Sequence, residues 1–428
     1  MNIVIKNILT AFWVEEKFQL SSSNIYIAND EIVSIDHTPA DFVADKTIDG
    51  NSKLLLPGLI NTHTHAYMSL FRNFADDLPF QEWLFDKILP LEDKLAETDA
   101  YWGSQLAIAE MIQSGTTCFA DMHMFIHQTT KAVEESGIRA CISRGLVGED
   151  SDEGGLRRIQ EAKEEYIEWK DRAEGRITFM LAPHAPYTCD PKFLEHIVTV
   201  AKDLNLGIHT HLSESLNEID TIRKVYNKSP VSHLESVGLF ELKTLAAHCV
   251  HLNDEDIDIL AKHKVSVASN PISNLKLANG IASLDRLLRK GVNVSLGTDG
   301  AASNNSLNMF KEMNFASLLL KGINHDAEVM NANTILQFAT VNAAKALGLE
   351  DKIGKIEVGM KADLILIDLD KPHFHPRNNL ISAMSYSAQA SDVETVVING
   401  KIVMENYKLT TIDTEKVYFH AQQFYNKL

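Results

Sequence analysis

Two histidines one residue apart, His63 and His65, directly follow an apolar run that ends in Leu59-Ile60. Side chains on a β-strand point alternately to its two faces, so these two imidazoles lie on the same side of a strand. Two imidazole nitrogens that converge at a strand end can hold a divalent metal ion. The pair therefore predicts a metal site whose remaining ligands come from elsewhere in the chain.

Two later apolar runs end in further candidate ligands. His211 closes one of them, with Glu214 three residues beyond it, and Asp299 closes another. Three neutral imidazoles and one carboxylate suit Zn²⁺ and leave a position open for water. Fe²⁺ and Mn²⁺ accept the same donors, so the identity of the metal stays open. Any one of these histidines alone is better explained as a hydrogen-bonded core residue, but the four residues together predict a metal centre.

Other histidines are weaker candidates. His209 shares a strand face with the third predicted ligand and is a rival for its place, although it lies deeper along the strand. A second His-x-His pair, His373 and His375, lies among prolines without an apolar strand before it, so we interpret it as a loop. His123 and His127 follow another apolar run, and we place them no closer than the rim of the pocket.

Strand-like runs and helical stretches alternate from Leu59 to about Leu349. The predicted strands are Leu59–His65, Thr116–Asp121, Ala140–Arg144, Ile177–Ala182, Gly207–His211, Thr244–His248, Val265–Ser269 and Val292–Gly297. The helical stretches between them include Asp99–Gln113, Gln128–Glu135, Leu156–Lys170, Lys192–Leu204 and Asp254–His263. This alternation predicts an α/β fold with a parallel sheet, and so many units favour a (β/α)₈ barrel. A doubly wound sheet would usually carry a glycine-rich phosphate turn, and the sequence contains neither nucleotide-binding pattern.

The barrel prediction explains where the candidate ligands occur. Catalytic residues of such barrels lie just beyond the carboxyl ends of the strands, which is where all four candidate ligands stand. Both ends of the chain are instead rich in short strands, with hairpins predicted around Asn29-Asp30 and Asn399-Gly400.

Composition excludes several classes of partner. The chain has 40 basic and 58 acidic residues, giving a net charge of −18, which argues against nucleic acid and anionic membranes as partners. The four cysteines are scattered without a C-x-x-C pair, so we expect small buried hydrophobes rather than a thiolate metal site or a disulfide framework. Without a visible signal peptide or a run long enough to span a bilayer, we expect a cytoplasmic protein.

The segment from Pro57 to His65 resembles the opening signature of the amidohydrolase superfamily, and the segment from Gly354 to Leu364 resembles its return from barrel to small domain. Over essentially the whole chain, the sequence is most similar within that superfamily to methylthioadenosine/S-adenosylhomocysteine deaminases and related aminohydrolases. The closer match is carried by Asp76–Leu84, Pro183–Tyr187, His211–Glu214, Ala247–Val250 and Ser269–Leu277.

The resemblance implies a domain organisation and a metal count. Residues 1–56 and 359–428 would form one composite β-sandwich, and residues 57–358 would form the catalytic barrel. Binuclear members carry a bridging lysine on the fourth barrel strand, whereas here Thr178–Pro183 leads to His184 without one. A single divalent metal ion is therefore expected, which lowers the pKa of a water molecule towards neutrality.

The resemblance also implies catalytic roles. Asp299 would bind the metal and take a proton from the water, and Glu214 would protonate the purine ring nitrogen and help move a proton to the departing ammonia. His248, which ends the sixth predicted strand, would orient the attacking water. The alternatives are a solvated residue that opens the next helix for Glu214 and a packed core histidine for His248.

Substrate contacts follow from the same resemblance. Glu92 would accept the two ribose hydroxyls, although its sequence context alone is that of a surface helix, and His184 would contact the ribose as well. Arg144 could pair with a substrate carboxylate or make a structural ion pair. Trp83 could cover the nucleoside or pack in the core, and Ser273-Asn274 could line the base pocket.

The leading hypothesis is therefore a metal-dependent deaminase that converts S-adenosylhomocysteine, 5′-methylthioadenosine or adenosine to the inosine analogue and ammonia. An alternative is hydrolysis of guanine or a triazine-like ring; Glu92, Arg144 and His184 together favour a ribosylated substrate. A non-catalytic metal-binding paralogue is the alternative from another class. The sequence leaves open the 5′ substituent and whether the protein is a homo-oligomer, as superfamily members often are.

Overall fold

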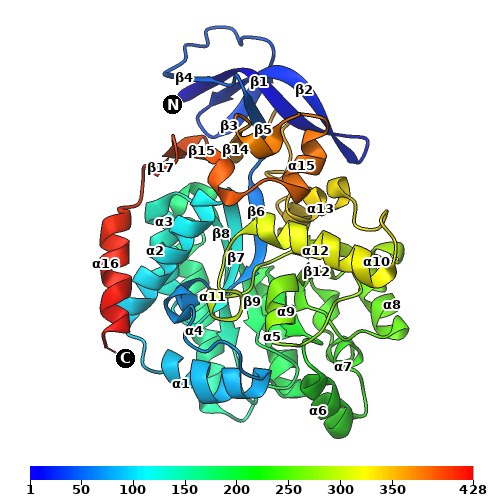
Figure 1. Cartoon of the computed structure of the whole chain (residues 1–428). Coiled ribbons are helices and arrows are strands. Elements are labelled where there is room, and N and C mark those ends of the chain that lie inside the picture. Colours follow the sequence, from blue (N-terminus) through cyan, green and yellow to red (C-terminus); the bar gives the residue numbers. More distant parts are fainter. Residues whose placement is uncertain (428) are drawn as a thin grey trace.

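Eight parallel strands form the central sheet of the computed structural model, which describes residues 1–427 (Figure 1). They follow one another in chain order as β6 (Leu59–Thr64), β7 (Thr116–His123), β8 (Arg139–Leu146), β9 (Ile177–Pro183), β10 (Gly207–Leu212), β11 (Thr244–His248), β12 (Ser266–Ser269) and β13 (Asn293–Leu296). The backbone N–H of Asp299 donates to the carbonyl of His63 at 2.9 Å, which brings the end of the last strand back to the first. The predicted α/β barrel and its eight strands are confirmed.

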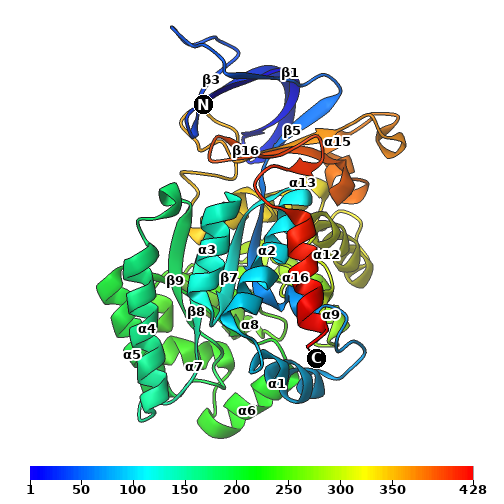
Figure 2. The same ribbon diagram turned by 90° about the vertical axis from the view of Figure 1, so that its left-hand side faces the viewer.

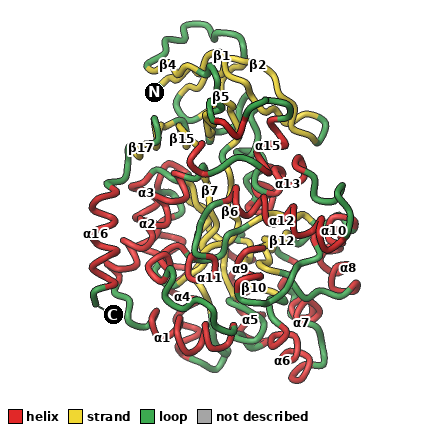
Figure 3. The backbone as a smooth tube through the Cα atoms, viewed as in Figure 1, coloured by secondary structure: helices red, strands yellow, loops and turns green. Residues whose placement is uncertain are grey.

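Helices surround this barrel (Figure 3). They are α1 (Leu89–Glu92), α2 (Glu97–Gln113), α3 (Ile126–Ser136), α4 (Glu153–Trp169), α5 (Pro191–Leu204), α6 (Leu216–Tyr226), α7 (Pro230–Ser236), α8 (Asp254–Lys262), α9 (Pro271–Lys276), α10 (Leu284–Arg289), α11 (Ala301–Asn304), α12 (Met309–Asn324), α13 (Ala332–Phe338) and α14 (Val341–Leu347). Shorter helical turns are η1 (Ala66–Phe71), η2 (Glu82–Ile88), η3 (Ala173–Gly175) and η4 (Leu239–Glu241). The five helical stretches expected from the sequence are all present.

Helix α5 illustrates how local sequence sets these elements. The carboxylate of Asp190 accepts the N–H of Phe193 at 2.6 Å, and Pro191 occupies the first turn, where no N–H is needed. Phe193 and Ile197, four residues apart, are buried on one face of the helix. The helix ends at Asn205, which adopts a left-handed conformation with φ +54°.

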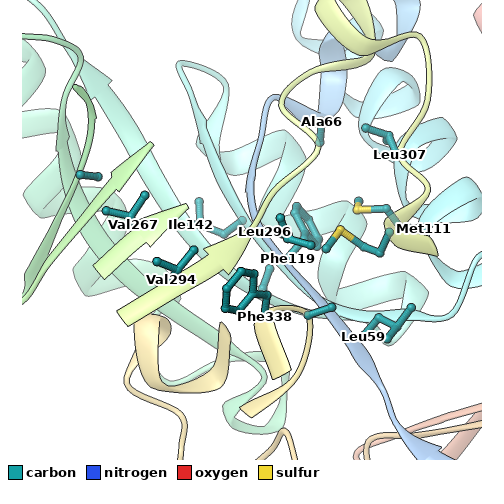
Figure 4. Packing of buried hydrophobic residues seen from close by; sticks show 14 of the residues in the cluster. Leu59, Ala66, Met111, Phe119, Ile142, Val267, Val294, Leu296, Leu307 and Phe338 are labelled. Carbon is teal, nitrogen blue, oxygen red and sulfur yellow. The ribbon is translucent and has the colours of Figure 1, made fainter. Parts of the chain in front are cut away.

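The main hydrophobic core lies between the strands and the surrounding helices. Figure 4 shows apolar side chains of β6, β7, β8, β12 and β13, among them Phe119 and Leu296, with Met111 of α2 and Phe338 of α13. A second cluster fills the interior of the barrel, where Cys118 and Cys141 are buried, and α14 belongs to the same cluster. Each fully buried large apolar side chain stabilises the fold by roughly 1.5–3 kcal/mol.

Nine strands from both ends of the chain form a second sheet. They are β1 (Asn2–Val14), β2 (Lys17–Ala28), β3 (Glu31–Ile35), β4 (Lys46–Asp49), β5 (Lys53–Pro57), β14 (Leu364–Asp368), β15 (Val393–Ile398), β16 (Lys401–Glu405) and β17 (Lys408–Leu409). The two halves join where β5 pairs antiparallel with β14. Residues of β1, β2, β3, β5 and β14 share one buried cluster, so the sheet folds around a core of its own.

Only Gly58 separates β5 of this sheet from β6 of the barrel. A Cβ atom at this position would lie 2.0 Å from Oγ1 of Thr117 on the neighbouring strand, so the close approach requires glycine. One nearly continuous extended segment therefore belongs first to the terminal sheet and then to the barrel.

The C-terminal segment is less purely β than its sequence suggested. It also contains the turns η5 (Pro372–Phe374) and η6 (Ala390–Asp392) and the helices α15 (Leu380–Tyr386) and α16 (Thr414–Tyr425). Helix α16 packs along α2 of the barrel rather than on the terminal sheet (Figure 2). The domain boundaries at residues 57 and 358 stay a prediction. Within residues 1–427, no helix combines the length and the apolar character needed to cross a bilayer.

A buried ion pair connects the barrel to the terminal sheet. Arg139, which begins β8 and is 2% exposed, donates from Nε to Asp363 Oδ2 at 2.7 Å and from Nη2 to Asp363 Oδ1 at 3.0 Å. The same Nη2 also donates to Oδ1 of Asn399 in the β15–β16 turn at 3.0 Å. Both charges are thus satisfied inside the protein, where an unpaired charge would be costly.

We predict that Asp363→Ala lowers the free energy of unfolding by about 3–5 kcal/mol, because it leaves the Arg139 guanidinium buried without its partner. Glu174→Ala is the matched control, since it breaks an ion pair with Lys401 in which both side chains are more than half exposed, and it should cost less than about 1 kcal/mol. Urea unfolding followed by circular dichroism measures both. Equal, small losses in the two variants would contradict the structural role of the Arg139–Asp363 pair.

Candidate metal centre and active site

The four predicted metal ligands converge at the carboxyl ends of the barrel strands. Nε2 of His65 lies 3.3 Å from Oδ1 of Asp299 and 3.3 Å from Nε2 of His211. Nε2 of His63 lies 3.6 Å from the same Asp299 oxygen. Four ligand atoms around a tetrahedral Zn²⁺ lie about 3.3 Å apart, given metal–nitrogen bonds of about 2.0–2.1 Å. The separations are those that a single divalent ion needs.

Hydrogen bonds fix which nitrogen of each imidazole faces the cluster. Nδ1 of His65 lies 2.5 Å from the carbonyl oxygen of Met122, and Nδ1 of His211 lies 2.8 Å from that of His184. A carbonyl oxygen only accepts, so each Nδ1 carries a proton, and Nε2 is the nitrogen that each ring turns towards the cluster. Two lone pairs that face each other at 3.3 Å repel unless a cation lies near both. Nε2 of His63 is likewise buried without a protein partner.

The protonation states suit a metal as well. Burial, reinforced by neighbouring imidazoles, lowers the pKa of His63 and of His211 well below its usual value, so both rings are neutral ligands. Burial alone would raise the pKa of Asp299, but the neighbouring His248 and His65 and hydrogen bonds from Ser273 and Gly300 lower it. Neutral imidazoles around one carboxylate are a donor set that fits Zn²⁺, Fe²⁺ or Mn²⁺.

His209, the rival ligand, lies behind this cluster. Its ring is fully buried, and its Nε2 lies 2.9 Å from Nδ1 of His63. Burial lowers its pKa to about 3, so it stays neutral. When Nε2 of His63 offers its lone pair to a metal, Nδ1 of that ring donates to His209, which therefore orients His63.

The β13 loop that carries Asp299 is tightly packed. Asp299 has φ +62° and accepts hydrogen bonds on Oδ2 from Ser273 at 2.6 Å and Ser303 at 2.8 Å. A Cβ atom on Gly297 would lie 2.7 Å from the backbone nitrogen of His63, so only glycine lets the two strand ends approach. This packing holds the carboxylate beside His63 of β6 and His65, the residue that follows β6.

Glu214 stands next to the ligand cluster. Its Oε2 lies 3.7 Å from Nε2 of His248, and its Oε1 accepts a hydrogen bond from Nδ2 of Asn279 at 2.9 Å. Glu218 holds the loop, since its carboxylate accepts the backbone N–H groups of Ser213 at 2.7 Å and Glu214 at 2.9 Å. Burial, with the negative charge of Asp299 as a second cause, raises the pKa of Glu214 well above its usual value. Glu214 is therefore a carboxyl that can hold and donate a proton.

His248 ends β11 with a left-handed backbone, φ +71°, and it is buried. Its Nδ1 lies 2.9 Å from Oδ1 of Asn274, so the lone pair on Nε2 points towards the cluster. His248 thereby offers a ligand atom close to those of His63 and His211. Left-handed conformations at non-glycine residues cost about 1–3 kcal/mol and gather at functional sites. The geometry therefore goes beyond what a packed core histidine would need.

A cavity of about 450 Å³ opens onto these residues. Its lining consists of His65, Met68, Phe80, Trp83, Leu84, Phe85, Ile88, Leu89, Glu92, Asp93, Met122, His123, Met124, Gly145, Val147, His184, Tyr187, Thr188, His211, Glu214, His248, Asp299, Gly300, Ala302 and Ser303. The segment around α1, which supplies part of this lining, lies at the end of the molecule opposite the terminal sheet (Figure 1). The cavity combines a polar end at the ligand cluster with many apolar side chains elsewhere.

Three of the predicted substrate contacts lie in this cavity. Glu92, which its sequence context placed on the surface, is only 8% exposed and accepts a hydrogen bond from the hydroxyl of Tyr67. Burial raises its pKa above the usual value. Trp83 is buried with its indole N–H unpartnered, and His184 presents its ring beside that of His211. Each of the three can reach a bound ligand.

Arg144 is not among the residues that line the cavity, and its contact with a substrate stays a prediction. Its guanidinium donates to Glu165 at 3.0 Å, pairs with Glu161, and donates to the carbonyl oxygen of Met124 at 2.6 Å. Glu161 and Glu165 lie one turn apart on α4, which packs outside β8. The structural ion pair, the alternative for this residue, is the arrangement observed.

The two histidines placed no closer than the rim of the pocket differ in position, and other residues around the site were missed. His123 lines the cavity, with Nε2 2.6 Å from Oδ2 of Asp121, whereas His127 accepts from the indole of Trp169. Asn279 and Glu218, which hold Glu214, received no role. Asp121 and His123, one residue apart at the end of β7, form a pattern that the sequence could have revealed. Asn279, a single asparagine in a loop, forms no recognisable pattern.

Comparison with known proteins adds an independent line of information. The sequence pattern described as Amidohydrolase family matches residues 54–403. A curated relative from Thermoanaerobacter pseudethanolicus, named 5-methylthioadenosine/S-adenosylhomocysteine deaminase, is 50% identical over 423 residues, which cover 99% of this chain and 98% of the relative. Another relative of the same name, from Dictyoglomus turgidum, is 46% identical over 425 residues, covering 99% and 98%.

Solved structures agree with these relatives. A crystal structure of an adenosine deaminase from Xanthomonas campestris with bound zinc superposes with a TM-score of 0.94 at 33% identity, covering 99% of this chain and 98% of that one.

We predict that His211→Ala strongly reduces the metal bound per chain, because it removes one of the converging nitrogen donors. His209→Ala should weaken metal binding about 10- to 100-fold by freeing the orientation of His63. Metal analysis after equilibrium dialysis against limiting Zn²⁺ measures both. His375→Ala, an exposed histidine of the second His-x-His pair, is the control and should bind as much metal as the unmodified protein; full occupancy in His211→Ala would refute the proposed site.

Proposed function

The chain belongs to the amidohydrolase family, and we propose that it is a metal-dependent hydrolase that deaminates adenine nucleosides. S-Adenosylhomocysteine, 5′-methylthioadenosine and adenosine are the candidate substrates, and the products are the inosine analogue and ammonia. The observation that carries this proposal is a buried, proton-holding Glu214 beside His248 and the four converging metal ligands. Relatives about half identical over the whole chain carry the name of such a deaminase.

We propose that His63, His65, His211 and Asp299 hold one divalent ion, most simply Zn²⁺, with Fe²⁺ or Mn²⁺ as alternatives. The zinc in the related adenosine deaminase structure supports this choice. The fourth strand, β9, contains no lysine that could bridge a second ion. When bound, the ion supplies the Lewis acidity that makes a water molecule nucleophilic near neutral pH.

Asp299 and His248 prepare that water in the proposed mechanism. The serine hydroxyls on Oδ2 of Asp299 fix the plane of its carboxylate, and the lowered pKa leaves it ionised and able to take the proton of the water. Because Nδ1 of His248 is tied to Asn274, the lone pair on its Nε2 can accept the second O–H and aim the oxygen. Both side chains thereby set the direction of attack on the purine carbon that bears the amino group.

Glu214 supplies the proton on the other side of the reaction. Its raised pKa lets the carboxyl donate to the adjacent purine ring nitrogen, which makes the neighbouring carbon electrophilic. As the carbon–nitrogen bond to the amino group breaks, the water proton taken by Asp299 passes to the amino nitrogen and ammonia leaves. The second water proton returns to Glu214 as the carbonyl of the product forms. The separated pKa values of Glu214 and Asp299 keep the two carboxyl groups in different roles.

Glu92, His184 and Trp83 would bind the nucleoside. The Glu92 carboxyl, now engaged by Tyr67, can accept the two ribose hydroxyls, and His184 can contact the ribose beside the metal cluster. Trp83 can cover the nucleoside with its ring and offer its unpartnered N–H. A buried carboxylate with no role in the chemistry favours a ribosylated substrate over a guanine or triazine-like ring, the alternative substrates.

A solved atrazine chlorohydrolase from Arthrobacter aurescens, complexed with zinc, has a TM-score of 0.91 at 23% identity and covers 99% of both chains, which shows the shared fold alone. A non-catalytic metal-binding paralogue, the remaining alternative, would have no need of Glu214 and His248 beside the ligands.

We predict that the zinc-loaded protein releases ammonia from adenosine analogues in a coupled glutamate dehydrogenase assay. Glu214→Gln should lower kcat about 10²- to 10⁴-fold, the usual contribution of a general acid, with little change in KM. Glu82→Gln, an exposed glutamate of the neighbouring turn η2, is the control and should keep full activity. Absence of ammonia with all three candidate substrates, while an established adenosine deaminase responds, would reject the function.

We predict that Glu92→Gln raises KM for nucleosides about 10- to 100-fold, because hydrogen bonds to a charged acceptor contribute roughly 1.5–3 kcal/mol. Deamination of free adenine, which lacks the ribose, should change little. Comparing the two substrates in the same preparation separates lost recognition from lost folding. A variant with unchanged KM for nucleosides would remove Glu92 from the substrate site.

A further inference from the structure

We infer that Tyr67 is a positioning residue, which fixes the carboxylate of Glu92 relative to the metal ligands and thereby aligns a bound ribose for attack at the base. This inference rests on the proposed deaminase function and adds to it a residue that does not line the cavity. Three features carry it: the hydrogen bond from the Tyr67 hydroxyl to Oε1 of Glu92, the complete burial of Tyr67, and its place two residues after His65.

The phenol of Tyr67 holds a carboxylate that belongs to another segment. Glu92 ends α1, and within residues 1–427 the Tyr67 hydroxyl is the one group that hydrogen-bonds its carboxylate. A carboxylate has about four acceptor sites, so this contact leaves sites free for the two ribose hydroxyls. Burial raises the pKa of Glu92 and the hydrogen bond from Tyr67 lowers it, so the phenol also favours the charged acceptor.

The surroundings of Tyr67 leave its side chain little room to move. Its ring packs against His123 and Phe125 in edge-to-face contacts, with ring centroids 4.8 Å and 5.5 Å away. Nδ1 of His123 accepts the backbone N–H of Phe125 at 3.1 Å, which fixes that ring in turn. A Cβ atom on Gly103 of α2 would lie 2.5 Å from the carbonyl oxygen of Tyr67, so glycine lets the two backbones approach. The hydroxyl is therefore a fixed donor.

The end of β7 holds Tyr67 and a metal ligand together. The carbonyl oxygen of Met122 accepts from Nδ1 of His65, and Oδ1 of Asp121 accepts the backbone N–H of the residue between His65 and Tyr67 at 2.8 Å. The next residue of β7, His123, contacts the Tyr67 ring. Three successive residues of one strand thus support three successive residues that begin with a metal ligand.

Glu92 and the metal ligands consequently share one support. In the proposed function Glu92 binds the ribose, while water attacks the base at the ligand cluster, so the separation of the two places decides whether the base is aligned. A misplacement of about 1 Å can lower a rate about 10²-fold. Without the phenol, the Glu92 carboxylate would lose its one hydrogen-bond partner among the described residues and could turn away from the productive position.

A double-mutant cycle tests this inference with zinc-loaded Tyr67→Phe, Glu92→Ala and the double variant, assayed on the candidate nucleoside that the unmodified protein deaminates fastest. We expect Tyr67→Phe to lower kcat/KM about 10- to 100-fold, with part of the loss in kcat. In the Glu92→Ala background the same change should cost less than about twofold, because no carboxylate is left to hold.

Tyr101→Phe is the matched control. The Tyr101 hydroxyl donates to Oε2 of Glu135 at 2.5 Å, and neither residue lines the cavity. Losing this second tyrosine–glutamate hydrogen bond should change kcat/KM less than about twofold. Metal analysis should find as much zinc in Tyr67→Phe as in the unmodified protein, because the contact between His65 and Met122 is retained.

Crystal structures of the zinc-loaded unmodified protein and of Tyr67→Phe give a readout that does not depend on turnover. We expect the Glu92 carboxylate to move or to occupy several rotamers in the variant, while His65 keeps its position.

An equal loss of kcat/KM with and without Glu92 would overturn the inference, because Tyr67 would then act on the fold in general. An unchanged kcat/KM in Tyr67→Phe, a loss of zinc, or an unmoved Glu92 carboxylate would each contradict it as well. If the unmodified protein releases no ammonia from any candidate nucleoside, the proposed function fails, and the two crystal structures still decide whether Tyr67 places Glu92.

Discussion

Two backbone carbonyls, of Met122 and His184, decide which nitrogen of the neighbouring imidazoles carries the proton. By accepting from Nδ1 of His65 and His211, they turn two lone pairs towards one point. The barrel brings those carbonyls, one in β7 and one on the residue after β9, beside two rings, one on the residue after β6 and one in β10. A parallel barrel does this naturally, since all its strands end on one side. The chemistry thus depends on backbone placement as much as on side-chain identity.

Where the strands converge, residues at their ends adopt strained backbone conformations. Ser213, His248 and Asp299 all have left-handed backbones although none is glycine. Such strain persists only where surrounding contacts over-determine the conformation, and here these contacts are buried hydrogen bonds: Glu218 to the Ser213 loop, Asn274 to His248, and two serines to Asp299. The hydrogen bonds around the cavity therefore hold the strained backbone in place and also position the charged side chains.

The barrel and the candidate ligands could be predicted because they depend on local patterns: apolar strands, and histidines spaced to share a face. Arg144 could not be placed in this way. Its strand-end position is compatible with a substrate contact and with the ion pairs that it makes to Glu161 and Glu165, one turn apart on α4. Glu92 shows a different limit of the sequence, because its helix alone suggested an exposed position. It is buried by Tyr67 and by the segment that folds over the cavity. Helix α16 was not predicted because it is stabilised by packing against α2, which lies far away in the sequence.

The passage of one extended segment through Gly58, from the terminal sheet directly into the strand before His63, also limits how this protein can change over evolutionary time. Domains joined by flexible linkers can be shuffled between genes, since each folds without the other. Here β5 pairs with β14 on one side of Gly58, and β6 pairs with β7 on the other. Recombination at this junction would cut a strand shared by two cores, so the sheet and the barrel are expected to be inherited as a single module.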